Sequence, residues 1–352
     1  MQLSDIDYHL PPELIADRAI EPRDQARLLV LDRQTGQIMH RRFSDIAEHL
    51  TPGDVLVMNN SKVIPARLIG RKEMTGGQVE LLLEYEVEPG LWRVIGKKIT
   101  QANRIIFDDS PLEAAVEDKR AGHYLVRFNM IGAHFMKEID RIGQVPLPPY
   151  IVRKRRESAT GLVQPSEHDK DNYQTVYAST PGSVAAPTAG LHFTERLLLD
   201  LKQKNIETVF LTLHVGYGTF APIKDSIDQH VMHSEFYHVD ASSLNTILRA
   251  KEAGRRIIAV GTTTTRVLEH LFAEMDKNPH AFALQGWTNI FITPGYNFKC
   301  IDGLITNFHL PKSTLLLLVS ALAGHSNIMR AYKEAISKQY RFYSYGDAML
   351  II

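Results

Sequence analysis

The sequence predicts an α/β protein with a mixed, largely parallel β-sheet flanked by helices, into which a small antiparallel β-barrel domain is inserted. Two changes of pattern along the 352 residues support this prediction. Residues 67–146 hold short apolar runs separated by Gly, Pro, Asn or Asp turns, with one helix expected near 133–142, which is typical of a small barrel. Helices and apolar strands then alternate, which is typical of a sheet with parallel strands. We therefore expect an α/β domain of residues 1–66 and 147–352 and a barrel domain of residues 67–146.

Individual elements of the α/β domain follow from hydrophobic spacing and capping residues. Residues 27–32 and the apolar stretch after the next turn predict a hairpin, and residues 53–59 predict a buried strand. After the barrel, strands are expected at 207–214 and 256–261. Helices are expected at four places, the first capped by Thr194 and the second ended by Gly254: 194–203, 242–253, 265–275 and 312–321.

The composition is that of an ordinary soluble globular chain, with 40 Lys and Arg residues against 40 Asp and Glu residues. A net charge of zero excludes a protein that coats nucleic acid indiscriminately, but it leaves room for a local basic patch. The single cysteine, Cys300, excludes an internal disulfide and a multi-cysteine zinc site and suits a reducing compartment. We find no export signal, and the longest apolar run, 315–322, is too short to cross a bilayer. We expect a cytoplasmic protein without a membrane span.

Four segments share a pattern in which small residues at the end of a strand or loop precede a polar or imidazole group and then a helix or turn. The first, residues 182–193, is rich in Gly, Ala and Pro just ahead of a helix. Small residues let a ligand approach the backbone, and N–H groups at a helix amino terminus attract carboxylates or phosphates. A tight loop that only fixes the entry of the helix would show the same pattern.

The second and third segments carry a histidine and a run of threonines. A strand delivers His214 and then Gly216 and Gly218, but no third glycine follows at the spacing of a dinucleotide fingerprint. His214 could equally be a hydrogen-bonded structural group. Residues 261–265, a glycine and four threonines between a strand and a helix, predict either an anion or nucleotide cradle or an extended helix cap. They lack the lysine of a phosphate-binding loop, so nothing indicates phosphate hydrolysis.

The fourth segment, residues 304–315, brings Asn307, Phe308 and His309 to the end of a strand ahead of a proline-marked turn. Open α/β sheets bind ligands in the crevice beyond the carboxyl ends of their parallel strands. We therefore expect the four segments to converge on one pocket.

The histidines and one basic run raise two further possibilities. Among 15 histidines, His230, His233 and His238 have the best spacing for a metal, but without an HExxH helix or accompanying thiolates we expect no metal site. Residues 153–156, Arg-Lys-Arg-Arg, form the only dense basic run. This run could be a solvated loop or could hold the phosphates of a nucleic acid. No nucleophile elbow, Ser-His-Asp order or kinase motif is recognisable.

The same segments resemble, nearly end to end, the S-adenosylmethionine:tRNA ribosyltransferase-isomerase family of bacterial queuosine synthesis. Long motifs in a fixed order carry the resemblance: IDYHLPPELIADRAIEPRDQARLLVLD at 6–32, VMNNSKVIPARLIG at 57–70, GQVPLPPYI at 143–151, YQTVYASTPGSVAAPTAGLHF at 173–193, HVGYGTFAPI at 214–223, MHSEFYHV at 232–239, GTTTTRVLE at 261–269, IFITPGYNFKCIDGLITNFHLPKSTLLLLVSALAG at 290–324 and YRFYSYGDAMLI at 340–351.

The resemblance implies an α/β domain with an inserted β-barrel, in agreement with the change of pattern near residue 66. It also implies a reaction in which the ribosyl part of S-adenosylmethionine moves onto 7-aminomethyl-7-deazaguanine at the wobble position of tRNA with a GUN anticodon. The product is epoxyqueuosine, and adenine and methionine are released. S-adenosylmethionine is then a consumed cosubstrate, and no further cofactor or metal is implied. We expect a monomer.

Site residues follow from placing this chemistry on the matching motifs. A histidine that titrates near neutrality suits removal of the acidic C5′ proton beside the sulfonium and later protonation of adenine, with the roles left unassigned among His192, His214 and His309. The residues expected to bind the cosubstrate are Gly182, Ser183, Ala186, Thr188, Gly190, Gly216, Gly218, Thr219, Gly261, Thr262, Thr263 and Asn307. The residues expected to bind tRNA, through phosphate contacts or base stacking, are Arg153, Lys154, Arg155, Arg156, Tyr217, Phe308 and Tyr345.

Two other interpretations of the sequence stay open. The first is a nucleotide-dependent enzyme that acts on a small molecule, with the basic run unused. The second is a non-catalytic RNA-binding module, which would bind tRNA without releasing adenine from S-adenosylmethionine. Strand ends that form a pocket and three well-placed histidines favour an enzyme over the module.

Overall fold

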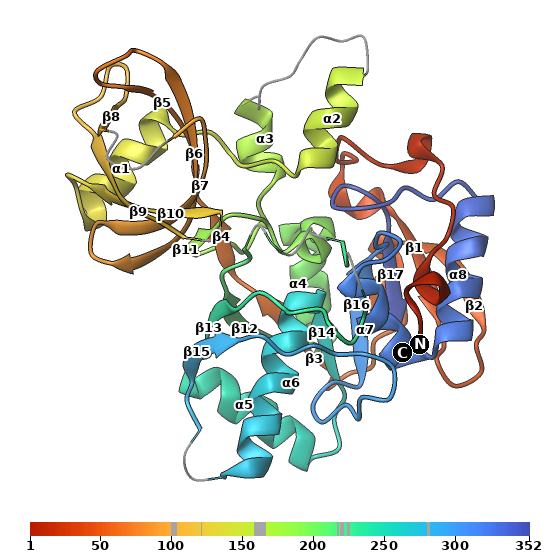
Figure 1. Ribbon diagram of the computed structural model, residues 1–352. Coiled ribbons are helices and arrows are strands. Elements are labelled where there is room, and N and C mark those ends of the chain that lie inside the picture. Colours follow the sequence, from red (N-terminus) through yellow and green to blue (C-terminus); the bar gives the residue numbers. More distant parts are fainter. Residues whose placement is uncertain are drawn as a thin grey trace.

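The computed structural model describes residues 1–99, 104–120, 122–157, 167–216, 218, 222–223, 226–279 and 282–352. A barrel and a larger α/β body lie side by side, with two short helices, α2 and α3, beside the passage between them (Figure 1). This is the predicted fold class, a mixed α/β sheet with an inserted antiparallel barrel, and the prediction is confirmed. The limits of the two domains stay a prediction, although all six barrel strands fall inside residues 67–146.

One nine-stranded sheet forms the centre of the α/β body. Four neighbouring strands near its middle are parallel to one another, the next pair along is antiparallel and the one after it parallel, and the pairs at both edges are antiparallel. The strand order is β15 (Gln285–Thr288), β13 (Glu235–His238), β12 (Glu207–Leu213), β3 (Val55–Asn59), β14 (Ile257–Val260), β16 (Gly303–Asn307), β17 (Ala348–Ile351), β1 (Arg27–Leu31) and β2 (Ile38–Arg42).

Helices cover both faces of this sheet because successive strand residues point to opposite sides. The β3 side chains Val55 and Val57 belong to the core with the helices α5 (Ala241–Glu252), α6 (Thr262–Lys277), α7 (Thr314–Ala323) and α8 (His325–Ser337). Leu56 and Met58 of the same strand pack on the other face with the 3₁₀ helix η4 (Phe43–Glu48) and the helix α4 (Glu195–Gln203). As predicted, the Thr194 hydroxyl caps α4 by accepting a hydrogen bond from the Leu197 N–H at 3.2 Å.

Six antiparallel strands close the barrel. Phe135 and Ile139 of the helix α1 (Gly132–Ile142) pack into its core. The closed structure leaves no free sheet edge, which a small barrel inserted in a larger body would otherwise expose. In order around the barrel the strands are β10 (His123–Phe128), β7 (Leu91–Lys97), β6 (Gln78–Glu88), β5 (Arg67–Lys72), β8 (Arg104–Ile106) and β9 (Glu113–Arg120).

A two-stranded parallel ribbon joins the α/β body to the barrel. It pairs β4 (Ser61–Val63), which leads to the barrel, with β11 (Thr180–Ser183), which leads back to the body. The helices α2 (Pro149–Glu157) and α3 (Glu167–Asn172) lie between these two crossings along the chain, and the sequence did not predict them. The remaining 3₁₀ helices are η1 (Leu3–Ile6), η2 (Pro12–Leu14), η3 (Arg23–Gln25) and η5 (Thr188–His192).

The helices in the described residues are all too short or too polar to span a membrane. The longest of those helices, α6, has 16 residues, whereas a bilayer requires about 20.

A buried carboxylate fixes α6 against the segment that leads into β16. Glu269 is fully buried, and its two oxygens accept hydrogen bonds from the N–H groups of residues 299, 300 and 301 at 2.7 to 3.0 Å and from the Tyr296 hydroxyl at 3.2 Å. Four donors therefore replace the hydration of this carboxylate. Because the start of α6 and the end of β16 line the pocket described below, this contact helps to position its walls.

We expect Glu269→Gln to lower the free energy of unfolding by about 2–5 kcal/mol. The glutamine side chain of the variant keeps only one acceptor oxygen. Its NH₂ group would point at buried N–H donors, which would then have no hydrogen-bond acceptor. Urea denaturation of the variant and of the wild type measures the difference. Glu274→Gln on the same helix is a matched control, because the Glu274 carboxylate is half-exposed and pairs with the exposed Lys277; a loss of stability for Glu269→Gln no larger than for this control would refute the account.

Candidate active site

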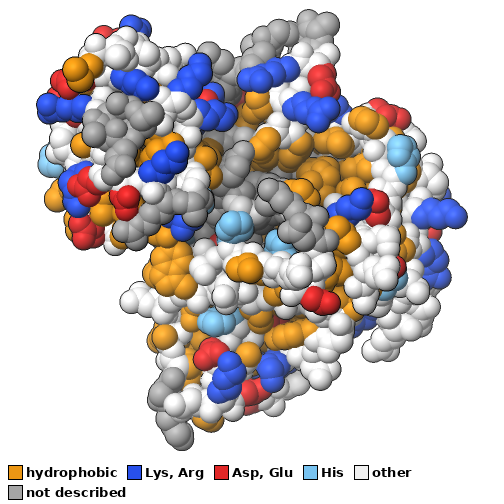
Figure 2. All heavy atoms as spheres, viewed as in Figure 1, with side chains coloured by type: hydrophobic (Ala, Val, Ile, Leu, Met, Phe, Trp, Pro, Cys, Tyr) orange, Lys and Arg blue, Asp and Glu red, His pale blue; other side chains and the backbone are white. Residues whose placement is uncertain are grey.

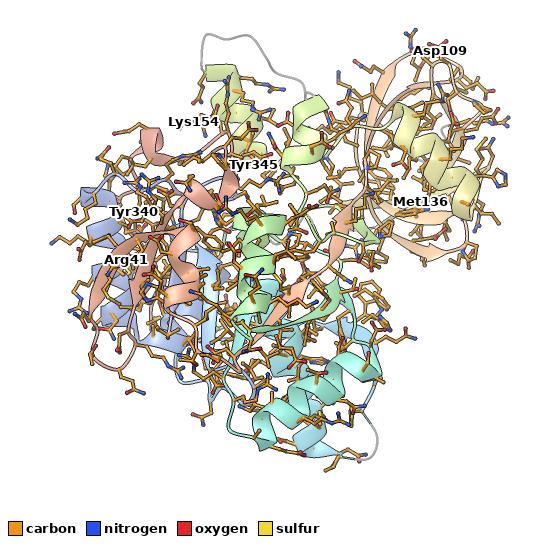
Figure 3. All side chains as sticks on the ribbon, turned by 180° about the vertical axis from the view of Figure 1, so that it is seen from behind. Arg41, Asp109, Met136, Lys154, Tyr340 and Tyr345 are labelled. Atoms are coloured by element: carbon orange, nitrogen blue, oxygen red, sulfur yellow. The ribbon has the colours of Figure 1, made fainter. Side chains whose placement is uncertain are left out.

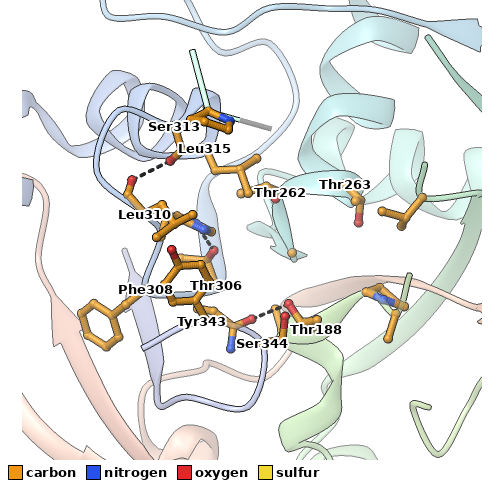
Figure 4. Close-up of a pocket in the computed structure, with 18 residues that line it drawn as sticks. Thr188, Thr262, Thr263, Thr306, Phe308, Leu310, Ser313, Leu315, Tyr343 and Ser344 are labelled. Atoms are coloured by element: carbon orange, nitrogen blue, oxygen red, sulfur yellow. Dashed lines mark hydrogen bonds between the residues drawn. The ribbon is translucent and has the colours of Figure 1, made fainter. Parts of the chain in front are cut away.

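A pocket opens at the carboxyl ends of β14 and β16, where the sequence predicts convergence. Its volume is about 80 Å³, and its mouth opens to solvent. Figure 4 shows its walls, which come from η5, the start of α6, the end of β16 and the start of α7. The described residues that line it are Ala186, Pro187, Thr188, Ala189, Val215, Pro222, Gly261, Thr262, Thr263, Thr306, Asn307, Phe308, His309, Leu310, Ser313, Leu315, Tyr343 and Ser344, and none carries a formal charge.

The Asn59 side chain holds the strand ends beneath this pocket. It is fully buried, donates to the Leu213 carbonyl at 3.0 Å and accepts from the Leu213 N–H at 3.1 Å. The same oxygen accepts from the Ser61 N–H at 3.0 Å, and the amide also donates to the Thr263 hydroxyl at 3.4 Å. One amide thus ties β3 to the end of β12, to the start of β4 and to the first turn of α6.

Gly261 allows the sharp turn from β14 into α6. Its φ is 92°, in the region that side chains disfavour, and it is the residue before the first helical threonine. The hydroxyls of Thr264 and Thr265 bond back to the carbonyls of Val260 and Gly261 at 2.8 and 3.2 Å. Thr262 and Thr263, by contrast, line the pocket, so the threonine run divides between helix and site.

His309 is the only one of the three candidate histidines that lines the pocket. Its Nε2 lies 2.8 Å from the Thr306 hydroxyl, and its backbone N–H donates to the Tyr332 hydroxyl at 2.9 Å. The Tyr8 hydroxyl in turn donates to the His309 carbonyl. Burial lowers the pKa of His309 to about 3, so the ring is neutral at physiological pH.

His192 lies behind the pocket wall. Its Nε2 is 3.2 Å from the Asn307 side-chain nitrogen, and the Asn307 oxygen accepts from the Thr188 hydroxyl at 2.9 Å. Burial, with smaller contributions from the charges of Arg341 and Arg23, lowers the pKa of His192 to about 3. His192 therefore contacts the pocket only through Asn307 and is held neutral.

His214 is placed outside the pocket, against the edge strands. Its ring stacks on Phe236 with centroids 6.0 Å apart, and its Nδ1 is buried without a hydrogen-bond partner. Gly182 makes room for it: a Cβ on that glycine would lie 2.7 Å from the His214 ring. Burial lowers the pKa of His214 as well. The structure thus does not bring the three histidines to one point.

The residues predicted to bind the cosubstrate divide into two groups. Ala186, Thr188, Gly261, Thr262, Thr263 and Asn307 line the pocket. Ser183 and Gly190 do not line it. The Ser183 hydroxyl donates to the Ala185 carbonyl and accepts from the Val215 N–H. A Cβ on Gly190 would lie 1.9 Å from the Tyr177 hydroxyl, so this glycine is needed for close packing. Gly182, Gly216 and Gly218 also lie outside the pocket wall, and Thr219 lies outside the described residues.

Two of the three residues predicted to stack on a base, Phe308 and Tyr345, are buried in the core. Phe308 is fully buried and packs edge-on against Tyr332 and Tyr340, although its backbone reaches the pocket. Tyr345 is 3% exposed and packs edge-on against Tyr173. A nucleobase could stack on either ring only if the core repacked, and stacking on these two residues stays a prediction. Tyr217 lies outside the described residues.

The basic run also divides into structural and exposed residues. The Lys154 ammonium donates to the carbonyls of residues 12, 13 and 15, and Arg155 forms a buried pair with Asp169 at 2.8 Å. These two side chains anchor α2. Figure 3 labels Lys154 beside this helix and Tyr345 nearer the middle of the molecule. For Lys154 and Arg155 a role in phosphate binding is therefore not supported. Arg153 and Arg156 are exposed.

A basic groove runs between α2 and the barrel. Arg153 and Arg156 line it from α2, whereas Arg67, Lys97 and Lys98 line it from the barrel. Its larger hollow has a volume of about 570 Å³. Glu80 and Glu157 also face it, so five cations outnumber two carboxylates. Figure 2 shows Lys and Arg side chains on both the barrel and the α2 region.

Sequence reasoning missed an ion pair close to the pocket. Arg266 and Glu235 are 3% exposed each and pair through the Arg266 Nη1 and the Glu235 Oε2. The Gly216 N–H donates to the other Glu235 oxygen at 3.0 Å. Both residues fall inside the family motifs at 232–239 and 261–269, and a charged residue on the apolar face of a helix was the available signal.

Groups of three or more His, Cys, Asp or Glu residues that could hold a metal are absent from the described part of the chain. Of the three histidines with suggestive spacing, His230 and His233 line one small pocket, whereas His238 lies 3.8 Å from Asp240.

The fold and the site define an α/β protein with a ligand pocket at the strand ends, buried neutral histidines and a neighbouring basic groove. Residues 3–351 match the family described as queuosine biosynthesis protein, and the chain belongs to this family.

Two relatives agree with this assignment over their full length. The chain is 50% identical over 357 residues to the S-adenosylmethionine:tRNA ribosyltransferase-isomerase of Halothermothrix orenii, with 100% of both proteins covered. It is 36% identical to the S-adenosylmethionine tRNA ribosyltransferase of Thermotoga maritima, whose crystal structure gives a TM-score of 0.56 with 99% of this chain and 100% of that chain covered.

Acid should destabilise the protein through two buried imidazoles, those of His192 and His309. The pKa of His192 falls from 6.5 to about 3 on burial, so between these values the unfolded chain binds more protons than the folded one. The free energy of unfolding therefore decreases as the pH drops below about 6.5, by up to about 1.4 kcal/mol per pH unit. We expect the urea midpoint to fall less steeply between pH 7 and pH 4.5 in His192→Gln than in the wild type.

His238→Gln is the control for this experiment, since the His238 side chain is 43% exposed. It should keep the pH dependence of the wild type. Parallel curves for His192→Gln and the wild type would show that the buried ring is not held neutral.

Proposed function

We propose that this protein is an S-adenosylmethionine:tRNA ribosyltransferase-isomerase that forms epoxyqueuosine. The observation that carries the proposal is the 50% identity, over the whole of both chains, to a protein with that name. The enzyme transfers the ribosyl part of S-adenosylmethionine to the aminomethyl nitrogen of 7-aminomethyl-7-deazaguanine at the wobble position of tRNA with a GUN anticodon. Adenine and methionine are released, and S-adenosylmethionine is consumed as a cosubstrate.

The pocket suits a sulfonium nucleoside. Its described lining combines hydroxyl and amide groups, from Thr188, Thr262, Thr263 and Asn307, with apolar walls such as Leu310 and Leu315. Hydroxyls and amides can bond the ribose and adenine, while apolar walls bury their faces. No ammonium or guanidinium stands among the described lining residues to repel the sulfonium.

His309 is the proposed base. The sulfonium acidifies the C5′ carbon of the ribose, and a neutral imidazole at the pocket wall can take that proton. Thr306 fixes the imidazole through the 2.8 Å contact. Burial keeps this imidazole unprotonated but also makes it a weak base, so the acidity of the C5′ proton must supply the driving force for the transfer. After proton transfer the ribose ring opens, adenine leaves, the aminomethyl nitrogen of the tRNA base attacks, and methionine is released with the sulfur electron pair. His192 acts behind Asn307 as a positioning residue.

The basic groove is proposed to hold the tRNA phosphates. Arg153 and Arg156 on one side and Arg67 and Lys97 on the other present cations to a backbone that runs between α2 and the barrel. Phosphate contacts of this kind position a nucleic acid, whereas the wobble base itself must leave the anticodon stack to reach a pocket.

The protein is proposed to act in the cytoplasm as a monomer. Its one cysteine, Cys300, is buried, and burial together with Glu269 raises the pKa of its thiol. Such a thiol is inert toward disulfide chemistry and fits a reducing compartment.

Adenine release from S-adenosylmethionine tests the function directly. We expect release only with tRNA that carries 7-aminomethyl-7-deazaguanine, and none with the same tRNA carrying guanine at that position. Release that needs no tRNA would favour an enzyme of small molecules. Tight binding of the modified tRNA without any release would favour a non-catalytic binding module.

His309→Gln should slow adenine release by about 10²–10⁴-fold, because an amide cannot accept the C5′ proton. Single-turnover release with saturating S-adenosylmethionine and modified tRNA measures the step. His40→Gln is the matched control. His40 lies on the edge strand β2, outside the pocket, and contacts Glu334 and Tyr340. A reduction of less than tenfold in His309→Gln would exclude this histidine as the base.

Arg156→Gln combined with Lys97→Gln should weaken tRNA binding and reduce the slope of log affinity against log salt by about one for each phosphate that the variant no longer neutralises. Fluorescence anisotropy at several salt concentrations measures both quantities. Lys333→Gln on α8 removes an exposed lysine away from the groove. The same slope in the double variant and in the control would place the tRNA elsewhere.

A further inference from the structure

Arg266 carries unsatisfied hydrogen-bonding groups in the interior of the protein. It lies on α6, four residues after Thr262, and is 3% exposed. Its Nη1 donates to Glu235, but Nε and Nη2 are both buried without a hydrogen-bond partner. Each buried unpaired donor costs about 1–3 kcal/mol, so a guanidinium left in this state points to a group that arrives later.

The two unpaired atoms form the side of the guanidinium that recognises carboxylates. The N–H bonds of Nε and Nη2 run parallel, and such a fork matches the two oxygens of a carboxylate. Glu235 occupies the other end of the guanidinium, and the Gly216 N–H holds Glu235 in place at 3.0 Å. Glu235 therefore orients the fork and leaves it open.

A small pocket surrounds this fork and adjoins the larger one. Its described lining residues are Gly218, His230, Met232, His233, Glu235, Arg266, Thr314 and Leu315, and Leu315 also lines the main pocket. Thr314 begins the ten-residue helix α7, whose first N–H groups lack helical acceptors. The positive end of a helix and an open guanidinium thus face the same small space.

Backbone N–H groups in the glycine-rich segments predicted to bind the cosubstrate are already in use. The Val184 N–H donates to the Val215 carbonyl, and the Gly190 N–H donates to the Pro187 carbonyl. The Val215 N–H donates to the Ser183 hydroxyl, and the Gly216 N–H donates to the Glu235 carboxylate. These segments therefore have few donors left for an anion, in contrast to Arg266.

We propose that Arg266 binds the α-carboxylate of the methionine part of S-adenosylmethionine, with the nucleoside in the main pocket. This inference rests on the proposed function and assigns the two ends of the cosubstrate. Arg266 then anchors the leaving methionine, one helical turn from the threonines that line the nucleoside pocket.

Binding of S-adenosylmethionine and of its decarboxylated analogue, measured by calorimetry without tRNA, tests the inference. We expect the wild type to prefer the carboxylated ligand by about 10–100-fold, as a charge-assisted bidentate contact provides. Arg266→Lys keeps the charge but removes the fork, so the preference should fall below about threefold. The affinity for the decarboxylated analogue should stay within about threefold of the wild-type value.

Arg256→Lys is a matched control. Arg256 forms a bidentate pair with Asp54 at the opposite end of β14, with 3.0 Å between its Nε and an Asp54 oxygen. This variant should keep the wild-type preference. A preference in Arg266→Lys equal to that of the wild type would overturn the inference and leave the proposed function intact. A wild type that binds neither ligand would instead overturn the proposed function.

Arginine Nε–H resonances of the ¹⁵N-labelled wild type give a second test that needs no variant. A buried Nε–H should move downfield with S-adenosylmethionine and not with the decarboxylated analogue, because only the first supplies a carboxylate acceptor. Identical arginine spectra with the two ligands would overturn the inference even if Arg266→Lys failed to fold.

Discussion

The geometry of the site depends on the buried side-chain amide of Asn59. Strand β3 is the point where the chain leaves the sheet for the barrel, and β12 is where it enters the glycine-containing loop after His214. By bonding both the N–H and the carbonyl of Leu213, Asn59 continues the pairing of β3 and β12 past their last regular partners. Its contacts with Ser61 and Thr263 then fix the exit toward the barrel and the start of α6. An apolar residue here would leave these polar backbone groups unpaired in the core, where each is costly.

The main pocket and the groove differ in charge, so they suit different kinds of ligand. The described lining of the main pocket holds no formal charge, and burial keeps His309 and His192 neutral. The groove between α2 and the barrel, by contrast, is lined by five cations and two carboxylates. A neutral interior can accept a sulfonium without repulsion, whereas an exposed cationic groove attracts a polyanion from solution. Arg266 is a buried cation beside the main pocket, and it is tolerated because Glu235 compensates its charge.

Local pattern was enough to predict the barrel, the alternating helices and caps such as Thr194, because each depends on residues a few positions apart. Helix α2 was not predicted, because only Ile151 and Arg155 of its side chains are buried and so no apolar face marks it in the sequence. An ion pair between Arg155 and Asp169 holds the helix in place. Which side chains enter the pocket was equally hard to foresee. Phe308 belongs to the core because residues 332–342, far along the chain, supply its aromatic neighbours.

The ribbon of β4 and β11 links the groove to the pocket. Residues of β4 lead from Asn59 to the barrel, and β11 leads directly to Ala186 and Thr188 in the pocket wall. The Gln174 side chain closes over the ribbon, accepting from the Val63 N–H at 3.0 Å and donating to its carbonyl at 2.7 Å. Because the two crossings between body and barrel are hydrogen-bonded to each other, the barrel is held by a paired strand rather than by two free linkers. The barrel face of the groove is therefore tied through paired strands to the wall of the pocket.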